Sequence, residues 1–359
     1  MDTDVWAWIR EYAGDAMGRR DGPRVELVQR VWAALQQTRT QPDDAVMAFR
    51  QAHDLAARLD EPWWMMFCDH WTLQTLLFRK RDFVRSLPLA LSAVEKARAP
   101  VFDDFPQRLC LQEDLISALQ GIDPLGHASR IAEALAAMEA EINPQSACYH
   151  CLLSLRTEHY RDTGRLAEAR ANALAASKKA ALASDYHHVT EAYANLCQIA
   201  FLQHDWPHLG QWSRAGEMFD GRKTDEGCIA ELRMWQAAAL RRTGNEAEAF
   251  RQCRIARSRS RAPGIVPTAG YFDAWSAFYE VAGDFGRALR VRDRELSLLV
   301  NGGQIYLHCQ CRLKRARLLI ALNQPFGEEA AEVRRLSGAL IDPRDVLAEL
   351  DDLPATTPD

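Results

Sequence analysis

The sequence has no long hydrophobic run. Of its 359 residues, 48% are hydrophobic and 26% are charged, and the mean hydropathy is −0.30. No stretch approaches the roughly 18 consecutive apolar residues that a membrane-spanning helix needs. The N-terminal stretch MDTDVWAWIREY also lacks the basic segment and uninterrupted apolar core of a secretion signal. These absences exclude a spanning protein and predict a cytoplasmic chain.

Familiar catalytic motifs are also missing. The sequence contains no Gly-rich phosphate loop, no dinucleotide-binding glycine pattern after a strand, no H-E-x-x-H and no G-x-S-x-G. His187 and His188 form the only adjacent histidine pair, and neighbouring positions on a helix diverge by about 100°. We therefore predict a protein that is not an enzyme and that needs no cofactor.

The nine cysteines are scattered rather than spaced as a framework. Two short clusters combine cysteine with histidine: Cys148, His150 and Cys151, and His308, Cys309 and Cys311. Within one helix such neighbours point in different directions, whereas a structural zinc site needs four converging ligands. The sequence therefore predicts free, mostly buried thiols and no metal site.

A six-residue pattern recurs along the chain. It consists of a small or polar residue, usually a charged residue, an apolar residue and then alanine or another small residue. The eight copies begin at Thr40, Arg81, Asp123, Gly164, His204, Gly244, Gly283 and Asn323, at intervals of 39 to 42 residues. Apolar residues recur every three or four positions on both sides of each copy, as helices require. These eight landmarks predict about sixteen helices in eight antiparallel pairs, with one extra helix at each end.

A single helix pair cannot bury its own apolar face, whereas stacked pairs share one continuous core. The sequence therefore predicts one elongated array rather than several globules. We assign residues 1–19 to an N-terminal capping helix, residues 20–340 to the helical repeats, and residues 341–359 to a C-terminal capping helix and a flexible tail.

The repeat resembles the tetratricopeptide repeat. Two segments carry the resemblance: Tyr193, Leu196, Cys197 and Ala200 before His204-Asp205-Trp206, and Phe272, Trp275, Ser276 and Tyr279 before Gly283-Asp284-Phe285 and Ala288. The resemblance covers residues 22–340 and implies an all-α, right-handed alpha-alpha superhelix. The period of about 40 residues exceeds the usual 34, and is similar to long-period arrays in bacterial signal-responsive regulators and kinesin light chains. Arginines stand where the family is usually apolar, at Arg156, Arg233, Arg312 and Arg315.

In tetratricopeptide arrays the first helix of each pair lines a concave groove, and the resemblance implies the same role here. The candidate groove residues are Trp64, Trp71, Phe78, Glu158, Arg161, Gln198, Phe201, Met234 and Arg241. Trp64, Trp71 and Phe78 are spaced by seven and would form one aromatic stripe. This stripe is expected to be an open binding surface, part of the core, or an apolar face covered by the N-terminal helix.

Positive charge is concentrated in residues 221–320, which hold 18 Lys and Arg against 10 Asp and Glu. Arginines at helical spacing predict two exposed basic ridges on adjacent second helices, and these are Arg251, Arg254, Arg261, Arg287, Arg290 and Arg294. Guanidinium groups suit bidentate contacts with carboxylates or phosphates. The other interpretation of the ridges is a solvated helix face.

These patterns predict a non-enzymatic scaffold or adaptor that binds a peptide or partner protein in the groove. One alternative is a signal- or peptide-responsive regulatory sensor that acts through a separate effector. A second alternative is an RNA or acidic-partner binder that uses the ridges, which the net charge of −5 disfavours for nucleic acid. The sequence does not indicate an oligomeric state.

Overall fold

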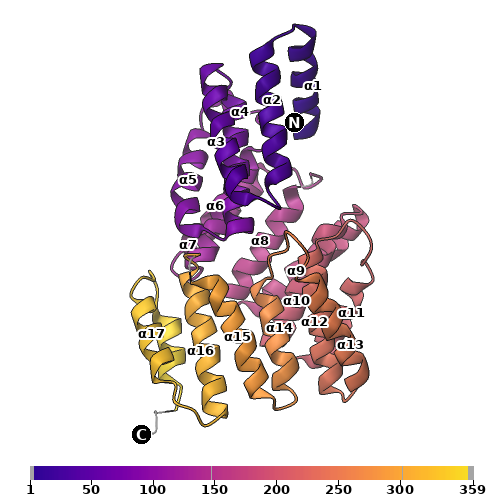
Figure 1. The fold of residues 1–359 in the computed structure, drawn as a ribbon, viewed down its shortest axis with the longest axis vertical. Coiled ribbons are helices and arrows are strands. Elements are labelled where there is room, and N and C mark those ends of the chain that lie inside the picture. Colours follow the sequence, from indigo (N-terminus) through magenta and orange to yellow (C-terminus); the bar gives the residue numbers. More distant parts are fainter. Residues whose placement is uncertain (1–3, 147, 301, 355–359) are drawn as a thin grey trace. The chain divides into compact units, whose positions relative to one another are not determined.

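The computed structural model describes residues 4–146, 148–300 and 302–354, and within these ranges it contains helices and no strands (Figure 1). Eighteen α-helices occur in the described residues, in chain order eight pairs and one further helix at each end, which confirms the predicted all-α class. The pairs are α2 (Gly22–Gln37) with α3 (Pro42–Arg58), α4 (Pro62–Gln74) with α5 (Phe83–Lys96), α6 (Arg108–Ile122) with α7 (Ala128–Glu141), α8 (Cys148–Asp162) with α9 (Leu166–Leu182), α10 (Tyr186–Leu202) with α11 (Trp206–Glu217), α12 (Glu226–Arg242) with α13 (Glu246–Arg259), α14 (Ala269–Glu280) with α15 (Phe285–Leu299), and α16 (Ile305–Ala321) with α17 (Gly327–Ser337). The end helices are α1 (Val5–Gly18) and α18 (Arg344–Asp351).

Each sequence landmark marks the turn inside a helix pair. In six landmarks the first residue has a positive φ, between 52° and 80°, and these residues are Arg81, Gly164, His204, Gly244, Gly283 and Asn323. A left-handed residue ends an α-helix by turning the chain out of its axis. The next residue often starts the second helix, since Asp82, Asp205 and Asp284 each accept a hydrogen bond from the backbone N–H three residues later. The landmark is therefore a helix stop followed directly by a helix start.

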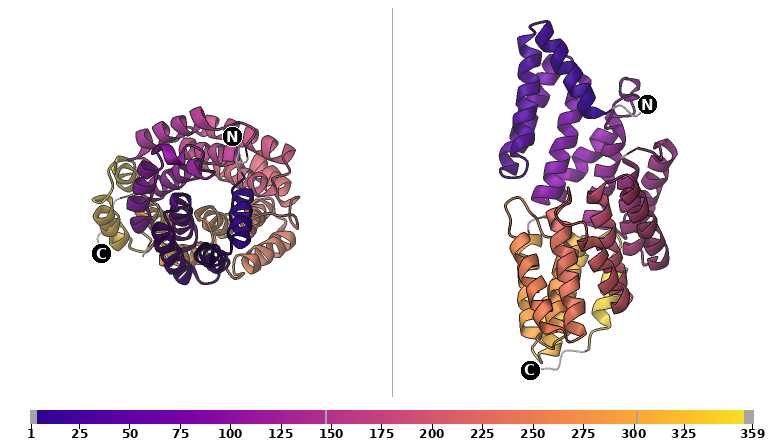
Figure 2. Two further views of the ribbon diagram at one scale, coloured as in Figure 1. Left: turned by 90° about the horizontal axis from the view of Figure 1, so that it is seen from above. Right: turned by 90° about the vertical axis from the view of Figure 1, so that its right-hand side faces the viewer.

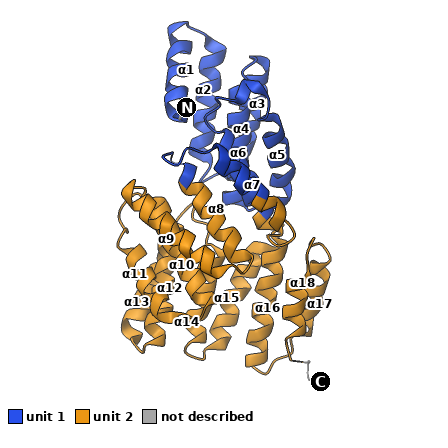
Figure 3. Cartoon of the chain, turned by 180° about the vertical axis from the view of Figure 1, so that it is seen from behind, with its two compact units in different colours: residues 1–119, 133–149 blue, residues 120–132, 150–359 orange. Residues whose placement is uncertain are grey.

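The chain divides into two compact units (Figure 3). Unit 1 contains residues 1–119 and 133–149, and unit 2 contains residues 120–132 and 150–359. In the side view of Figure 2 the orange helices of unit 2 lie next to one another along a common direction. In unit 2, Leu232, Trp235 and Phe278 belong to one large buried cluster, and a smaller cluster around Leu313 and Val333 lies near the C-terminal end of the chain.

One local departure from α-helical geometry occurs at the end of α4. Residues Thr75–Lys80 form a π-helix, in which each hydrogen bond spans one residue more than in an α-helix. The extra residue per turn rotates the side chains that follow it relative to those on α4. A seven-residue spacing therefore does not keep one face across this segment.

None of the described helices has both the length and the apolar character that a membrane crossing needs.

Candidate functional site

The aromatic residues of α4 are covered by α1 rather than open. Trp64 is fully buried, and its ring lies 4.8 Å from the Trp8 ring and 5.1 Å from the Tyr12 ring, centre to centre. Trp71 is partly buried, with its ring centre 6.3 Å from that of Trp6. Trp64 is therefore covered by the N-terminal helix, one of the three arrangements expected from the sequence.

Phe78 does not continue this aromatic row as the seven-residue spacing predicted. It lies in the π-helical segment and is 43% exposed, whereas Trp64 is completely buried. The single stripe of three aromatic residues is thus corrected to a fully buried Trp64, a partly buried Trp71 and a separate, exposed Phe78. The physical reason is the altered rotation per residue in the π-helix.

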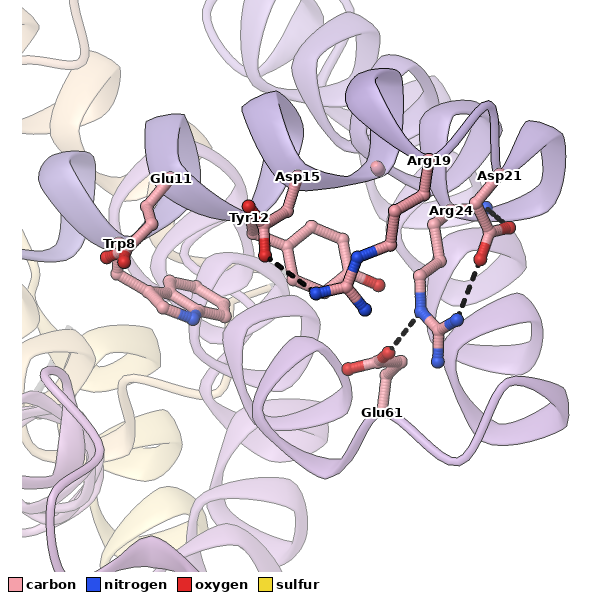
Figure 4. Close-up of a pocket in the computed structure, with 9 residues that line it drawn as sticks. Trp8, Glu11, Tyr12, Asp15, Arg19, Asp21, Arg24 and Glu61 are labelled. Carbon is pink, nitrogen blue, oxygen red and sulfur yellow. Dashed lines mark hydrogen bonds and ion pairs between the residues drawn. The ribbon is translucent and has the colours of Figure 1, made fainter.

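A cavity of about 350 Å³ lies beside Trp8 and Tyr12 of α1, in unit 1 (Figure 4). It is lined by Trp8, Glu11, Tyr12, Asp15, Ala16, Arg19, Asp21, Arg24 and Glu61. Arg24 links two carboxylates of the lining: its Nη1 donates to Asp21 at 2.7 Å and its Nε donates to Glu61 at 2.7 Å. The hydrogen bond from Arg24 lowers the pKa of Asp21, while burial and then Glu61 raise the pKa of Tyr12.

In unit 2 a continuous series of hydrogen bonds crosses four successive first helices. We call Arg161, Asn195, Gln198, Glu231 and Thr268 the polar line. Nη1 of Arg161 on α8 donates to Oδ1 of Asn195 at 2.9 Å and to Oε1 of Gln198 at 2.6 Å, both on α10. Nε2 of Gln198 donates to Oε1 of Glu231 on α12 at 2.7 Å. Oγ1 of Thr268, the cap of α14, donates to Oε2 of Glu231 at 2.5 Å.

Glu231 is the buried centre of the polar line. The residue is 1% exposed, and its carboxylate also accepts a hydrogen bond from Nε1 of Trp235 at 3.1 Å. Burial raises its pKa although the hydrogen bonds from Thr268, Gln198 and Trp235 oppose the shift. Gly270 permits this close approach, because a Cβ at that position would lie 2.2 Å from Oε1 of Glu231 and 2.3 Å from Nε2 of Gln198.

Glu158, one turn before Arg161 on α8, keeps a proton near neutral pH. Burial raises the pKa of its carboxyl to about 8, against a partial lowering by Arg161, and the charges of Glu191, Asp162 and Glu231 add to the rise. The side chains of Glu158, Arg161 and Gln198 remain partly accessible. This arrangement combines hydrogen-bond donors, acceptors and a carboxyl that gives up its proton when a cation approaches.

The other groove candidates on α10 and α12 serve mainly as packing. Met234 is fully buried, and the Phe201 ring lies 4.9 Å from the Trp235 ring. Arg241 donates from Nη1 to the backbone carbonyl of Phe278 at 3.0 Å and lies over that phenylalanine ring at 4.5 Å. Met234 is corrected from a groove residue to a core residue, because its position on α12 faces the neighbouring helices. Any binding role of Phe201 and Arg241 stays a prediction.

The six ridge arginines are all exposed, on α13, on α15 and just after α13. Two of them have local acidic partners, since Arg251 pairs with Glu248 at 2.5 Å and Arg287 with Asp284 at 3.2 Å. Arg294 lies over the Trp275 ring at 5.2 Å. Arg254, Arg261 and Arg290 complete the exposed set, and recruitment of a partner by these ridges stays a prediction.

Histidines from two separate sequence motifs meet at the start of α10. Nδ1 of His150 on α8 and Nδ1 of His188 on α10 lie 2.9 Å and 2.7 Å from the same oxygen, Oδ2 of Asp185. Burial alone would raise the pKa of Asp185, but the hydrogen bonds with His188 and His150 hold it well below its usual range. On the other side of the ring, Nε2 of His188 lies 3.6 Å from Sγ of Cys151. The sequence interpretation treated the two motifs separately and missed this convergence.

No protein-family model matches the sequence, and no curated protein matches it. Among solved structures, the chain is similar to a tetratricopeptide repeat protein from Parabacteroides merdae, with 11% identity, a TM-score of 0.43, and coverage of 75% of this chain and 93% of that one. It is also similar to the APC/C hetero-tetramer Cut9-Hcn1, with 11% identity, a TM-score of 0.33, and coverage of 90% of this chain and 62% of that one. The chain is an all-α array of helix pairs, as its own landmark turns and helices show.

Proposed function

We propose that this chain is a non-enzymatic interaction scaffold that binds a peptide segment of a partner protein along the polar line of unit 2. The observation that carries the proposal is the run of hydrogen bonds from Arg161 through Gln198 and Glu231 to Thr268. Arg161 on α8, Gln198 on α10 and Thr268 at the cap of α14 are partly accessible, so an extended segment of several residues could contact them in turn, while the buried Glu231 holds them in position.

The charges beside the polar line favour a basic partner segment. Glu158, Asp162 and Glu191 are partly accessible, and Arg161 is already engaged by Asp162 at 2.9 Å. A lysine or arginine side chain of the partner would compensate the remaining carboxylates. It would also lower the pKa of Glu158 from about 8 and release its proton at neutral pH.

The test is a selection of phage-displayed random peptides on the full chain, followed by fluorescence anisotropy. We expect the selected peptides to contain Lys or Arg. We expect Gln198→Ala to lower the affinity of the selected peptides about tenfold or more, because a hydrogen bond to a charged group contributes about 1.5–3 kcal/mol. Gln211→Ala, exposed on the second helix α11, is the matched control. Thermal melts establish that both variants are folded.

Calorimetry supplies a second measurement that does not depend on truncating a side chain. At pH 7 the binding heat of a selected peptide is expected to differ between phosphate and Tris buffers, because Glu158 transfers its proton to the buffer. Glu158→Gln should remove this difference. Selected peptides that lack basic residues, and whose affinity ignores both Gln198→Ala and Glu158→Gln, would refute the proposal.

A further inference from the structure

A cluster of potential metal ligands lies where the N-terminal part of α8 meets the start of α10, within unit 2. We propose that His150, Asp185 and His188 form a binding site for a divalent transition-metal ion, with Zn²⁺ as the best match to their chemistry. Imidazole nitrogen and carboxylate oxygen are both common zinc ligands. Two imidazoles with one carboxylate also leave a coordination position for water or for a group of a partner.

The three ligand atoms converge. They all lie within 4.8 Å of one another, and the two imidazole rings are 5.4 Å apart, centre to centre. Oδ2 of Asp185 lies 2.9 Å from Nδ1 of His150 and 2.7 Å from Nδ1 of His188. Bonds of about 2.0–2.1 Å in a tetrahedral site would separate the ligand atoms by about 3.3 Å. An ion therefore requires the two nitrogen–oxygen distances to lengthen by only about half an ångström.

A second histidine–aspartate pair shows which part of the cluster helix capping explains. Asp205 caps α11 as Asp185 caps α10, and in both pairs Oδ1 accepts a hydrogen bond from the backbone N–H of the third following residue at 3.3 Å. His208 also lies 2.7 Å from Asp205, as His188 does from Asp185. Capping thus accounts for one histidine at each aspartate.

His150 is the residue that capping does not require. It comes from a different helix, is 6% exposed, and directs Nδ1 to an oxygen that His188 already contacts. Oδ2 of Asp185 meets the imidazole of His150 as well as that of His188, and this brings three potential ligand atoms to one place. The cluster at Asp185 therefore contains a third potential ligand, His150, in addition to the aspartate and histidine that the group around Asp205 also has.

The residues around His188 define an alternative position for the ion. Cys151 lies 3.6 Å from Nε2 of His188, and His187, His188 and Glu191 form a second trio of potential ligands. Only one ring nitrogen of His188 faces Asp185, so an ion bound with Cys151 would occupy the opposite side of the ring. We assign the ion to the Asp185 side because three ligand atoms with His150 converge there, and Cys151 is then not a ligand.

The site is tested by titrating the full chain, without a polyhistidine tag and after removal of metal by a chelator, with ZnCl₂ in a calorimeter. We expect one ion per chain and a higher melting temperature with Zn²⁺. His150→Gln should weaken binding by more than about 100-fold, because changes to residues outside the ligand set alone cost about 10- to 100-fold. His208→Gln removes the matched capping histidine and should leave Zn²⁺ binding unchanged. Melts in chelator check that each variant is folded.

Cobalt distinguishes the two positions of the ion. The Co²⁺-loaded chain is expected to show visible d–d bands without a thiolate-to-metal charge-transfer band, and Cys151→Ser should bind Co²⁺ as the wild type does. Three results would overturn the assignment: no Zn²⁺ binding by the wild type, equal binding by His150→Gln, or a charge-transfer band that Cys151→Ser abolishes. Peptide selection in the presence of chelator tests the scaffold function separately.

Discussion

The carboxylate of Asp123 accepts a hydrogen bond at 2.7 Å from the backbone N–H of Ile341, which lies 218 residues further along the chain. It also accepts from the N–H groups of Gly126 at 2.9 Å and Asp342 at 3.3 Å, and Asp123 is 1% exposed. One buried side chain thus joins the first segment of unit 2 to its last helices.

Asp123→Ala is expected to destabilise unit 2 by about 3 kcal/mol, because each buried donor left without a partner costs about 1–3 kcal/mol. Hydrogen exchange should become faster at the amides of Ile341 and Asp342 and remain slow in the middle of α12. The control is Asp351→Ala, an exposed position on α18. Equal melting temperatures of Asp123→Ala and wild type would contradict the structural role of Asp123.

Gly270→Ala should destabilise the chain by about 1–3 kcal/mol, the usual cost of overpacking. The added methyl group would collide with Glu231 and Gln198. It should therefore also lower the affinity of the chain for the peptides selected on the polar line. A Cβ added at Gly286, in α15, would meet no other atom within 4 Å. Gly286→Ala is therefore expected to be neutral or to stabilise by up to about 1 kcal/mol. Urea denaturation of the two variants measures both effects.

Trp8→Ala should lower the stability of unit 1 by about 3 kcal/mol, because it uncovers Trp64 and leaves a cavity in the aromatic cluster. Tryptophan emission should shift to longer wavelength as Trp64 meets water. Trp32 on α2 is 54% exposed, and Trp32→Ala should change stability by no more than about 0.5 kcal/mol. If the two variants melt at the same temperature, α1 does not cover the cluster in solution.

The raised pKa of Glu158 predicts a pH dependence of stability. Its carboxyl has a pKa of about 8 in the folded chain against a usual 4.5, so the folded state holds the proton more tightly than the unfolded state. Stability linked to this group is full below pH 4.5 and is lost as pH rises towards 8. Glu158→Gln should flatten this part of the profile in melts at pH 5 to 8. Glu328→Gln, exposed on α17, should leave the profile as in the wild type.

The basic ridges give a prediction that is independent of the polar line. Reversing Arg254 and Arg290 together to glutamate should abolish binding of a fluorescent polyglutamate peptide at low salt. Salt at about 0.1–0.15 M should weaken wild-type binding, since exposed charges are screened beyond roughly 8–10 Å. A single-stranded RNA probe that binds with a steep logarithmic salt dependence would point to the nucleic-acid alternative instead. Binding that ignores the reversals would exclude the ridges.

The repeat architecture was predictable because its signals are local. A residue in the left-handed region followed by an aspartate cap fixes the turn within a few bonds, as at His204 and Asp205. The π-helical segment was not predictable in this way, because its extra residue is accommodated by how α4 packs on its neighbours. Phe78 was therefore assigned to a face that it does not share with Trp64.

The contacts of the candidate sites depend on residues in different repeats. Arg161 bonds to Gln198 at a separation of 37 residues, Gln198 to Glu231 at 33, and His150 contacts Asp185 at 35. These separations are slightly shorter than the landmark spacing. Scanning polar residues at that offset would have paired His150 with Asp185, whereas a search for ligands within one helix does not.

Two connections between neighbouring helix pairs in unit 2 are long. Residues 218–225 and 260–268 link one pair to the next, whereas the link at 183–185 is as short as the landmark turns at 163–165 and 243–245. Consecutive helices run in opposite directions, so the longer links collect at the edge away from the landmark turns. Chain length can vary at that edge without disturbing the stacking. Insertions in these links would add surface to the array while the helices keep their positions.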